Sequence, residues 1–388
     1  MTEGVRKPIG RLGRGKTVLF SLIPLAALLA VLEGGGRIIE LWIPPRIVDL
    51  GQGFLPGSRL FVPDPDDPAM LITNPDKLVS FQNQRFPLTK TPGTMRLFIL
   101  GGSSVNYLQY ELPHMAERLR QALAPRFQEV EIINCGGLSY GTHRLVLIAA
   151  EVLDYAPDVL LIYSGHNEFE ELEQLDLAHL RFLPLQRFLS HFATYRFVRD
   201  RIAAIQIAHL EEDRRRREIA DSVPDTSRTW NRIFSPDEIR ERMISYERNL
   251  STMIELCQSR RVPIIIGTVP SNLIKPNLPG EAGARYQQAL ALIHGGQRKE
   301  GLRLARRILR EAPRHQASDA ENEIIRAVAA RYRLPLADVE AAVIAAEPNG
   351  IPGETLFNDH CHLTPDGNAL LVAAYEREIR SIFGANAP

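Results

Sequence analysis

The chain has 388 residues, of which 45% are hydrophobic and 24% are charged, a composition typical of a globular protein and not of a disordered one. Lysine plus arginine and aspartate plus glutamate both total 46, so nothing in the overall charge favours nucleic acid as a partner. The three cysteines, Cys135, Cys257 and Cys361, are too few and too scattered to predict a disulfide framework.

The amino terminus carries a basic stretch followed by an apolar one. Five basic residues lie within residues 1–16, and the run TVLFSLIPLAALLAVL occupies residues 17–32. A spanning helix needs about 20 apolar residues, with a lower limit of about 17. We therefore expect a short signal anchor over residues 17–36, with a cytoplasmic tail before it and the rest of the chain translocated. A cleaved signal peptide and a buried core helix are the alternatives, although no small-residue cleavage pattern follows the run.

Residues 37–94 are rich in proline, aspartate and asparagine and show little periodicity, which indicates an extended arm. Five short apolar runs then alternate with helical stretches: RLFIL (96–100), VEIIN (130–134), DVLLIY (158–163), VPIIIGT (262–268) and LPLADV (334–339). Near-continuous apolar strands of this kind are typical of a parallel sheet that is covered on both faces. Residues 95–384 are therefore predicted to form a three-layer α/β/α sandwich with a five-stranded parallel sheet.

Two helical insertions are predicted within this domain. The first, residues 170–255, contains an amphipathic stretch at 185–220, whose Arg214–Arg217 run favours a solvated helix face over a phosphate or lipid contact. The second, residues 282–333, resembles a single tetratricopeptide unit. One such unit cannot bury its own apolar face, so we expect a helical hairpin docked on the domain, with a surface that could bind a protein partner.

Three motifs follow the first three predicted strands, where the carboxyl ends of parallel strands gather. The motif GGSS (101–104) presents Ser103 after a glycine turn, and NCGGLSYGT (134–142) supplies backbone N–H groups. The motif GHNEFEE (165–171) places the amide of Asn167 at the same edge. Backbone N–H groups and an asparagine amide are the donors that stabilise a developing oxyanion, so these loops predict a site for acyl transfer chemistry.

Asp359 and His362 lie three residues apart in FNDHCHLTPDG, near the carboxyl end of the chain. A serine nucleophile needs a histidine to take its proton and a carboxylate to orient that histidine. Thr364 and Pro365 predict the start of a helix that would fix the position of His362. The crowded His and Cys residues could suggest a metal site, but no distant ligand spacing supports it, so neither metal nor cofactor is expected. The pattern predicts Ser103, His362 and Asp359 as catalytic residues.

These motifs resemble those of the SGNH/GDSL hydrolase superfamily. With TVPSNL (268–273), they are closer still to bacterial membrane-anchored members that carry tetratricopeptide-like segments. The resemblance implies a flavodoxin-like fold, Ser103 as nucleophile, Asn167 as an oxyanion donor, and Asp359 with His362 as the D-x-x-H pair. Gly102 replaces the aspartate of the G-D-S motif, which is not one of the triad residues.

The second-loop oxyanion donor departs from the superfamily pattern. The usual glycine, counted five residues after Asn134, falls on Ser139, which can still donate its backbone N–H. Three glycines of the same loop are alternatives: Gly136, Gly137 and Gly141. The candidate oxyanion donors are therefore Asn167, Ser103, Gly137 and Ser139.

The motifs together predict a serine esterase that hydrolyses an acyl ester, on a small molecule or on a carbohydrate or other envelope component. An acyltransferase on the same fold and a catalytically idle binding scaffold stay open as alternatives, because fold does not select among them. The resemblance and the amino terminus imply a bacterial inner-membrane protein that contacts the membrane through residues 17–36. Its catalytic domain would then lie on the extracytoplasmic face, with no nucleic acid partner.

Overall fold

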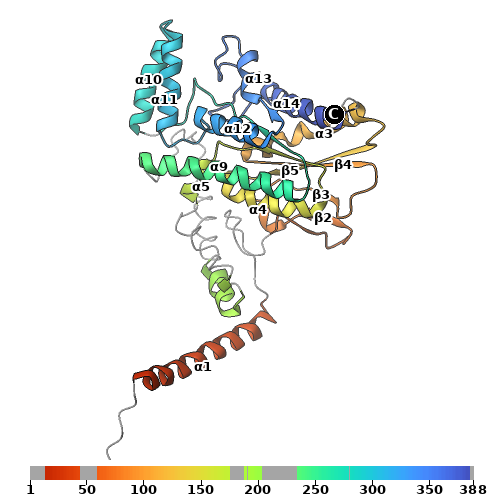
Figure 1. Ribbon diagram of the computed structural model, residues 1–388, viewed down its shortest axis with the longest axis vertical. Coiled ribbons are helices and arrows are strands. Elements are labelled where there is room, and N and C mark those ends of the chain that lie inside the picture. Colours follow the sequence, from red (N-terminus) through yellow and green to blue (C-terminus); the bar gives the residue numbers. More distant parts are fainter. Residues whose placement is uncertain are drawn as a thin grey trace, which may run out of the picture. The chain divides into compact units, whose positions relative to one another are not determined.

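The computed structural model describes residues 14–43, 59–174, 188–189, 191–202, 234–278 and 280–384 (Figure 1). The chain divides into two compact units, one formed by Met1–Leu50 with Arg181–Val223 and the other by Gly51–Leu180 with Pro224–Pro388. The predicted cytoplasmic tail before residue 14 and the arginine run at 214–217 lie outside the described residues.

The larger unit is built on a five-stranded sheet in the order β5-β4-β6-β7-β8, in which every neighbouring pair is parallel. The strands are β4 (Thr94–Gly101), β5 (Glu129–Gly136), β6 (Val159–Tyr163), β7 (Ile264–Gly267) and β8 (Leu336–Ala337). This confirms the five predicted strands and their parallel arrangement. The order matches the flavodoxin-like doubly wound sheet, whose switch point lies between its first and third strands, here β4 and β6.

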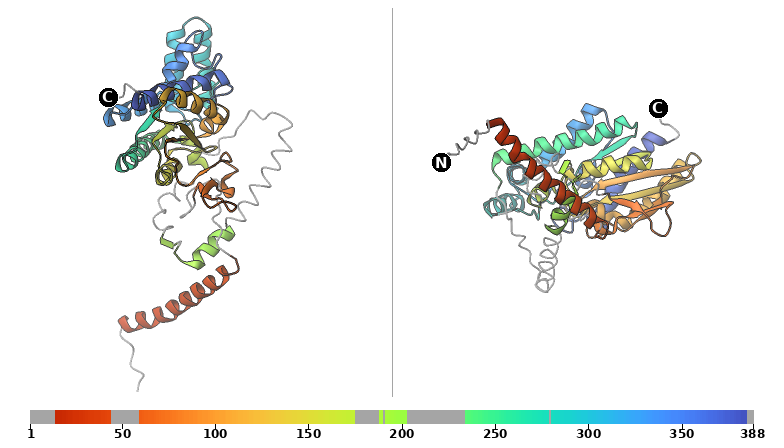
Figure 2. Two further views of the ribbon diagram at one scale, coloured as in Figure 1. Left: turned by 90° about the vertical axis from the view of Figure 1, so that its right-hand side faces the viewer. Right: turned by 90° about the horizontal axis from the view of Figure 1, so that it is seen from below.

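Helices cover both faces of this sheet, as the two views of Figure 2 show. One layer contains α3 (Leu112–Leu123), α13 (Val339–Ala346) and α14 (Pro365–Phe383). The other contains α4 (Thr142–Val152), α9 (Pro236–Ser259) and α12 (Asp319–Tyr332). All residues of β4, β6 and β7 are buried, because both faces are covered, and this explains their continuous apolar sequences.

The stretch predicted as an extended arm is partly folded into the domain. Within residues 37–94 the structure has a three-stranded antiparallel sheet of β1 (Phe61–Pro63), β2 (Met70–Thr73) and β3 (Arg85–Pro87). The rings of Phe61 and Phe86 lie 4.9 Å apart, and Phe86 lies 5.8 Å from Phe98 of β4. The prediction of an arm was wrong here because strands of three or four residues show no usable periodicity.

Both predicted insertions contain helices of the main layers, and much of the first, at residues 175–187 and 203–233, lies outside the described residues. Helix α9, from the first predicted insertion, and α12, from the second, belong to the helical layer on one face of the sheet. Their residues Tyr246, Met253 and Val328 are part of the main hydrophobic core. Among the described residues, α10 (Gly280–His294) and α11 (Arg298–Glu311) form a separate helical hairpin, which has a small core of its own around Tyr286 and Ile308. Amphipathic spacing predicted these helices correctly. It did not show which of them cover the central sheet and which form a separate insertion.

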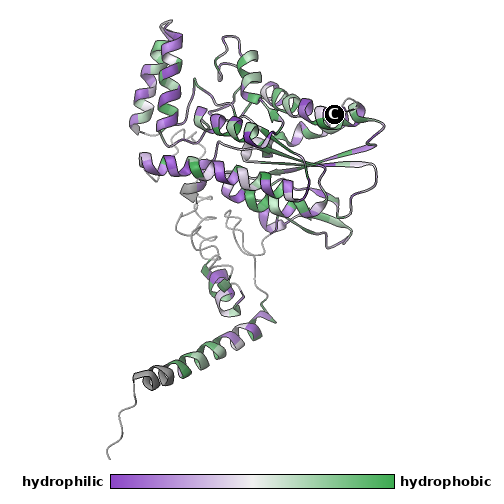
Figure 3. Ribbon diagram, in the orientation of Figure 1, coloured by the Kyte–Doolittle hydropathy of each residue, from purple (hydrophilic) through white to green (hydrophobic). Residues whose placement is uncertain are grey.

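The smaller unit is dominated by α1 (Arg14–Glu40), which is longer than the predicted segment 17–36. Leu22–Glu40 is long and apolar enough to cross a membrane by length and composition, and Figure 3 shows the apolar character of this helix. Glu33 accepts hydrogen bonds from the backbone N–H groups of Ala193 and Thr194, at 3.1 and 3.3 Å, and so caps a second helix at residues 193–202. Glu33, one of the two acidic residues of Leu22–Glu40, therefore has a defined structural partner.

Candidate active site

Ser103 lies directly after β4, as the first residue of the short helix α2 (Ser103–Asn106). The two preceding glycines allow this close turn. A Cβ added to Gly101 would collide with the carbonyl of Tyr163, and one added to Gly102 would collide with the amide of Asn167. Glycine at both positions therefore lets the serine loop pack directly against the loop after β6.

His362 connects Ser103 to Asp359. Its Nε2 lies 2.7 Å from the Ser103 Oγ, and its Nδ1 lies 2.6 Å from the Asp359 Oδ2. Because a carboxylate can only accept, Nδ1 carries the ring proton and Nε2 is left to accept from the serine hydroxyl. Three residues predicted from the sequence thus form a continuous chain of hydrogen bonds at the carboxyl edge of the sheet.

The Asp359 carboxylate is held in its ionised form. Burial opposes ionisation, but the His362 ring and the backbone N–H groups of Cys361 and His362 all donate to this carboxylate and outweigh it. The pKa of Asp359 therefore lies well below its usual value. A carboxylate that stays charged can orient the imidazole and stabilise it when it becomes positive.

The loop of Asp359 is held by Asn272, a buried residue that sequence reasoning did not identify. Its Nδ2 donates to the Asp359 carbonyl at 2.7 Å, and its backbone N–H donates to the His360 carbonyl at 3.1 Å. The motif TVPSNL that contains it was recognised in the sequence, but only as part of a resemblance. An asparagine in the loop that follows a central strand, five residues after the end of β7, is the signal that could have singled it out.

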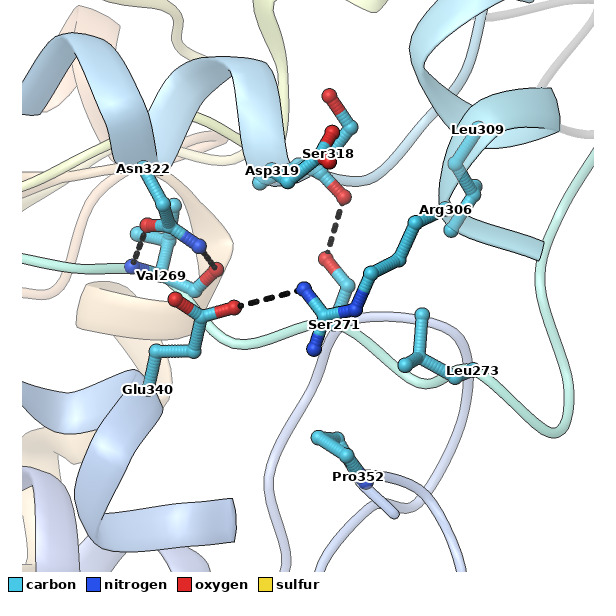
Figure 4. Close-up of a pocket in the computed structure, with 11 residues that line it drawn as sticks. Val269, Ser271, Leu273, Arg306, Leu309, Ser318, Asp319, Asn322, Glu340 and Pro352 are labelled. Atoms are coloured by element: carbon cyan, nitrogen blue, oxygen red, sulfur yellow. Dashed lines mark hydrogen bonds and ion pairs between the residues drawn. The ribbon is translucent and has the colours of Figure 1, made fainter. Parts of the chain in front are cut away.

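The loop after β7 is itself fixed by α12 (Figure 4). Asn322 accepts from the Val269 N–H at 2.7 Å and donates to the Val269 carbonyl at 3.0 Å. The cavity between these elements has a volume of about 20 Å³, with Ser271 and Glu340 among its lining residues. This is room for about one water molecule and not for a substrate, so the loop forms a firm support.

Asn167 and Ser139 lie on the two neighbouring loops. The side chain of Asn167 is buried beside Gly102, and one of its two amide N–H groups donates to the Tyr140 carbonyl at 3.1 Å. The second N–H is then available to donate to a substrate oxygen. Ser139 has a φ of +61°, the left-handed conformation that glycine adopts most readily. The serine therefore occupies the backbone conformation suited to a glycine, at the position where the superfamily pattern has one.

The hydrogen bonds of the second loop separate its candidate donors. Gly136 N–H donates to the Asn134 side chain, and Gly137 N–H donates to the Gly101 carbonyl. Within the part of the chain that the structure describes, the backbone N–H groups of Ser103 and Ser139 have no hydrogen-bond partner. Gly141 packs against Glu171 at the start of α4. Ser103 and Ser139 are thus the predicted donors whose N–H groups are uncommitted, whereas Gly137 is engaged.

A further histidine, His166, is buried next to the triad loop. Its Nδ1 accepts from the Ala317 N–H at 3.1 Å. Burial is the main reason that the pKa of His166 is lowered to about 3. The charges of His362 and His360 act in the same direction, and the charge of Asp359 opposes them. This ring is therefore neutral at physiological pH.

The triad loop also contains a possible metal-ligand group. Ligand atoms of Asp359, Cys361 and His362 lie within 4.8 Å of one another. However, both ring nitrogens of His362 are already committed, one to Asp359 and the other to Ser103. A metal ion would have to displace these contacts, so the donor set fits a triad better than a metal centre.

No protein-family profile matches the sequence, and no curated protein matches it. Solved structures with similarity include a GDSL-like lipase from Bacteroides thetaiotaomicron, 12% identical with a TM-score of 0.38, where the match covers 74% of this chain and 88% of that one. An acetylxylan esterase from Geobacillus stearothermophilus is 15% identical with a TM-score of 0.36, covering 74% and 94%. At these values the similarity carries no weight for function, which rests on the side-chain geometry described above.

Proposed function

We propose that the protein is a serine hydrolase that cleaves acyl esters, with Ser103 as nucleophile, His362 as general base and acid, and Asp359 as the orienting carboxylate. The observation that carries the proposal is the pair of hydrogen bonds on the two nitrogens of His362, at 2.7 Å to Ser103 and 2.6 Å to Asp359. These are the contacts that activate a serine hydroxyl, which is otherwise a weak nucleophile.

The reaction would proceed in two steps. As the Ser103 Oγ bonds to the acyl carbon, its proton passes to His362 Nε2 and the carbonyl electron pair moves onto the oxygen. Collapse of this intermediate expels the alcohol, which takes the proton from His362 and leaves an acyl-serine. Water then repeats the sequence and releases the carboxylic acid.

The oxyanion would be bound by the backbone N–H groups of Ser103 and Ser139 and by the amide of Asn167. The uncommitted N–H groups of the two serines support this choice. Gly137, a fourth candidate, is less favoured because its N–H already donates to the Gly101 carbonyl. Each such donor contributes roughly 10²–10³ in rate when it is aimed at the developing charge.

We also propose a carbohydrate or another polar envelope component as the acylated substrate. The ring of Tyr107 lies 5.0 Å from the His362 ring and is 51% exposed, and Tyr110 is 86% exposed. Both belong to the 3₁₀ helix η2 (Tyr107–Tyr110), in which residues three apart project from the same side. An exposed phenol ring beside the base, with a second one on the same short helix, suits a polar ring substrate better than a long acyl chain, which needs an enclosed apolar surface.

Residues 22–40 of α1 would anchor the protein in the membrane, with the catalytic unit on the extracytoplasmic side. The exposed apolar side chains of this helix, such as Leu25, Leu29 and Val31, support this proposal. Carbonate-washed membranes should retain the full-length chain, and protease added to spheroplasts should degrade the catalytic unit. Recovery of a soluble form that starts near residue 33 would indicate a cleaved signal peptide instead.

The catalytic proposal is tested by labelling with a fluorophosphonate probe, followed by peptide mapping. The wild-type protein should be labelled on Ser103, and Ser103→Ala should abolish both labelling and ester turnover while the circular dichroism spectrum stays unchanged. Ser104→Ala is the matched control, because Ser104 is the adjacent, buried serine of the same motif. Labelling that persists in Ser103→Ala and vanishes in Ser104→Ala would overturn the assignment.

A further inference from the structure

Four charged side chains are buried together behind the second and third loops of the site. Arg144 and Arg242 face Glu168 and Glu171, and each of these side chains is at most 1% exposed. The Arg144 Nε lies 2.8 Å from Glu171, and Arg242 contacts both glutamates. Two positive and two negative charges therefore balance one another, away from water.

This cluster reaches the candidate oxyanion donor Ser139 through Arg144. One Nη of Arg144 donates to the Ser139 carbonyl, while its guanidinium carbon lies 3.9 Å from the ring centroid of Tyr140. Ser139 is the residue with the left-handed backbone and the uncommitted N–H. An arginine that holds its carbonyl restrains the backbone rotation that sets the direction of this N–H.

The same cluster reaches Asn167 through helix α5 (Glu168–Gln174), which begins directly after it. The Glu171 N–H donates to the Asn167 carbonyl at 2.8 Å. Across the loops, Glu168 accepts from the Thr142 N–H at 3.0 Å, and Glu171 accepts from the Arg144 N–H at 3.2 Å. The two carboxylates thus cap the start of α4 and tie the loop of Asn167 to the loop of Ser139.

Stability alone gives a poor account of these four charges. Replacing a buried ion pair by apolar residues of similar volume is often neutral or stabilising. In addition, the Nε and Nη1 atoms of Arg242 are buried without a hydrogen-bond partner among the described residues, which is unfavourable. The cluster is better explained by the directions it imposes on the two loops.

We infer that Arg144 and Glu171, supported by Glu168 and Arg242, are positioning residues that aim the Ser139 N–H and the Asn167 amide at the oxyanion. This inference rests on the proposed hydrolase function. None of the four residues needs to touch the substrate, and their effect would pass through the two donors. The expected signature is therefore a loss of turnover with little change in substrate binding.

The test is Arg144→Lys, assayed with an ester that the wild-type protein turns over. Lysine keeps the charge for Glu171 but cannot also reach the Ser139 carbonyl, because it lacks the forked guanidinium. We expect kcat to fall about 10–100-fold, less than the roughly 10²–10³-fold for loss of a whole oxyanion donor, because the Ser139 N–H is misaimed and not removed. KM should change less than about twofold. The inhibition constant of a boronic acid, which forms a tetrahedral adduct on serine, should rise in parallel with the loss of kcat.

The matched control is Arg96→Lys, which alters a buried arginine paired with Glu131 at the opposite end of β4. It should leave kcat and boronate inhibition within about twofold of wild type. If Arg144→Lys does not fold, Glu171→Gln replaces it, since glutamine keeps the shape of the side chain but weakens its hold on Arg144. The same direction of change is expected.

The outcomes separate this inference from the proposed function. A wild-type protein that neither takes up the fluorophosphonate nor turns over esters would refute the proposed function itself. If the wild type is active and Arg144→Lys has the same kcat per folded molecule, only the positioning inference is refuted. If kcat of Arg144→Lys falls only in proportion to the folded fraction and boronate inhibition is unchanged, Arg144 has a structural role. That outcome would overturn the inference as well.

Discussion

Two buried arginines lie near opposite ends of β4 and hold different parts of the molecule. At the amino end, Arg96 contacts Glu131 at 2.7 Å and donates to the carbonyls of Tyr155 and Pro87. At the carboxyl end, Arg144 contacts Glu171 and the carbonyl of Ser139. The first arginine joins β4 to its structural neighbours, whereas the second joins loops that carry candidate catalytic groups.

This difference indicates that burial of a charge does not by itself show what the charge does. In doubly wound sheets, sites form at the carboxyl ends of the strands, and the amino ends are left to hold the sheet together. Changes at the amino end of β4 should therefore affect the free energy of unfolding, and changes at the carboxyl end should affect turnover. Substitutions at the two ends of β4 would test this division.

Asp359→Asn should reduce kcat about 10⁴-fold, because the amide presents the wrong partner to His362 and the ring adopts the wrong tautomer. The variant should still bind substrate and unfold at nearly the wild-type urea concentration. Steady-state kinetics on a turned-over ester and urea denaturation would measure the two effects. A variant with near-wild-type kcat would mean that Asp359 has no part in the proton transfer.

Asn167→Ala should lower kcat about 10²–10³-fold, since it removes one oxyanion donor but leaves Ser103 and His362 in contact. KM should change little, because the hydrogen bond strengthens only as charge develops on the substrate oxygen. The measurement is again steady-state kinetics. If KM rose and kcat were spared, Asn167 would be a substrate-binding group.

Arg96→Ala should reduce the free energy of unfolding by about 3 kcal/mol, because it leaves buried carbonyl groups and Glu131 without their partner. The kcat of the folded fraction should stay within about twofold of wild type. Urea denaturation, together with kinetics at a urea concentration well below the transition, would show both. A loss of kcat comparable to that of Arg144→Lys would abolish the distinction between the two ends of β4.

The smallest effect concerns pH and His166. Its pKa is about 3 in the folded protein, against about 6.5 in the unfolded chain. Between these values the unfolded chain binds more protons, so the folded state loses stability as the pH falls below about 6.5, by up to about 1.4 kcal/mol per pH unit. His166→Asn keeps an acceptor for the Ala317 N–H but cannot titrate. Between pH 6.5 and 4.5, its free energy of unfolding should fall less steeply than that of wild type, and equal slopes would contradict the prediction.

The sequence predicted the parts of the fold that repeat a simple pattern. The five strands of the main sheet are apolar throughout because both faces are buried, and such runs can be recognised without a structure. The motifs after β4, β5 and β6 were predictable because parallel strands bring their carboxyl ends to one edge. The small sheet of β1, β2 and β3 was missed, since its strands are too short to show a period.

The candidate site was predictable where chemistry restricts the residue type, and not where only position matters. Ser103, His362 and Asp359 were expected from their chemistry, and the structure brings them together. Asn272 and Arg144 donate to backbone carbonyls of other loops, and no motif around them indicates such a role. Their identification requires knowing which loops are adjacent, which depends on tertiary packing.

Ser103 and His362 form their hydrogen bond across 259 positions of sequence, nearly the full length of the catalytic unit. His362, the proposed base, lies just before α14, whose Tyr375 donates to the Ile162 carbonyl of β6 and whose Glu376 pairs with Arg118 of α3. Because a chain is synthesised from its amino terminus, the serine emerges long before its base. A growing or truncated chain would therefore carry an inert nucleophile. Reactivity at Ser103 would report that the last helix has docked, and would serve as a direct assay for completed folding.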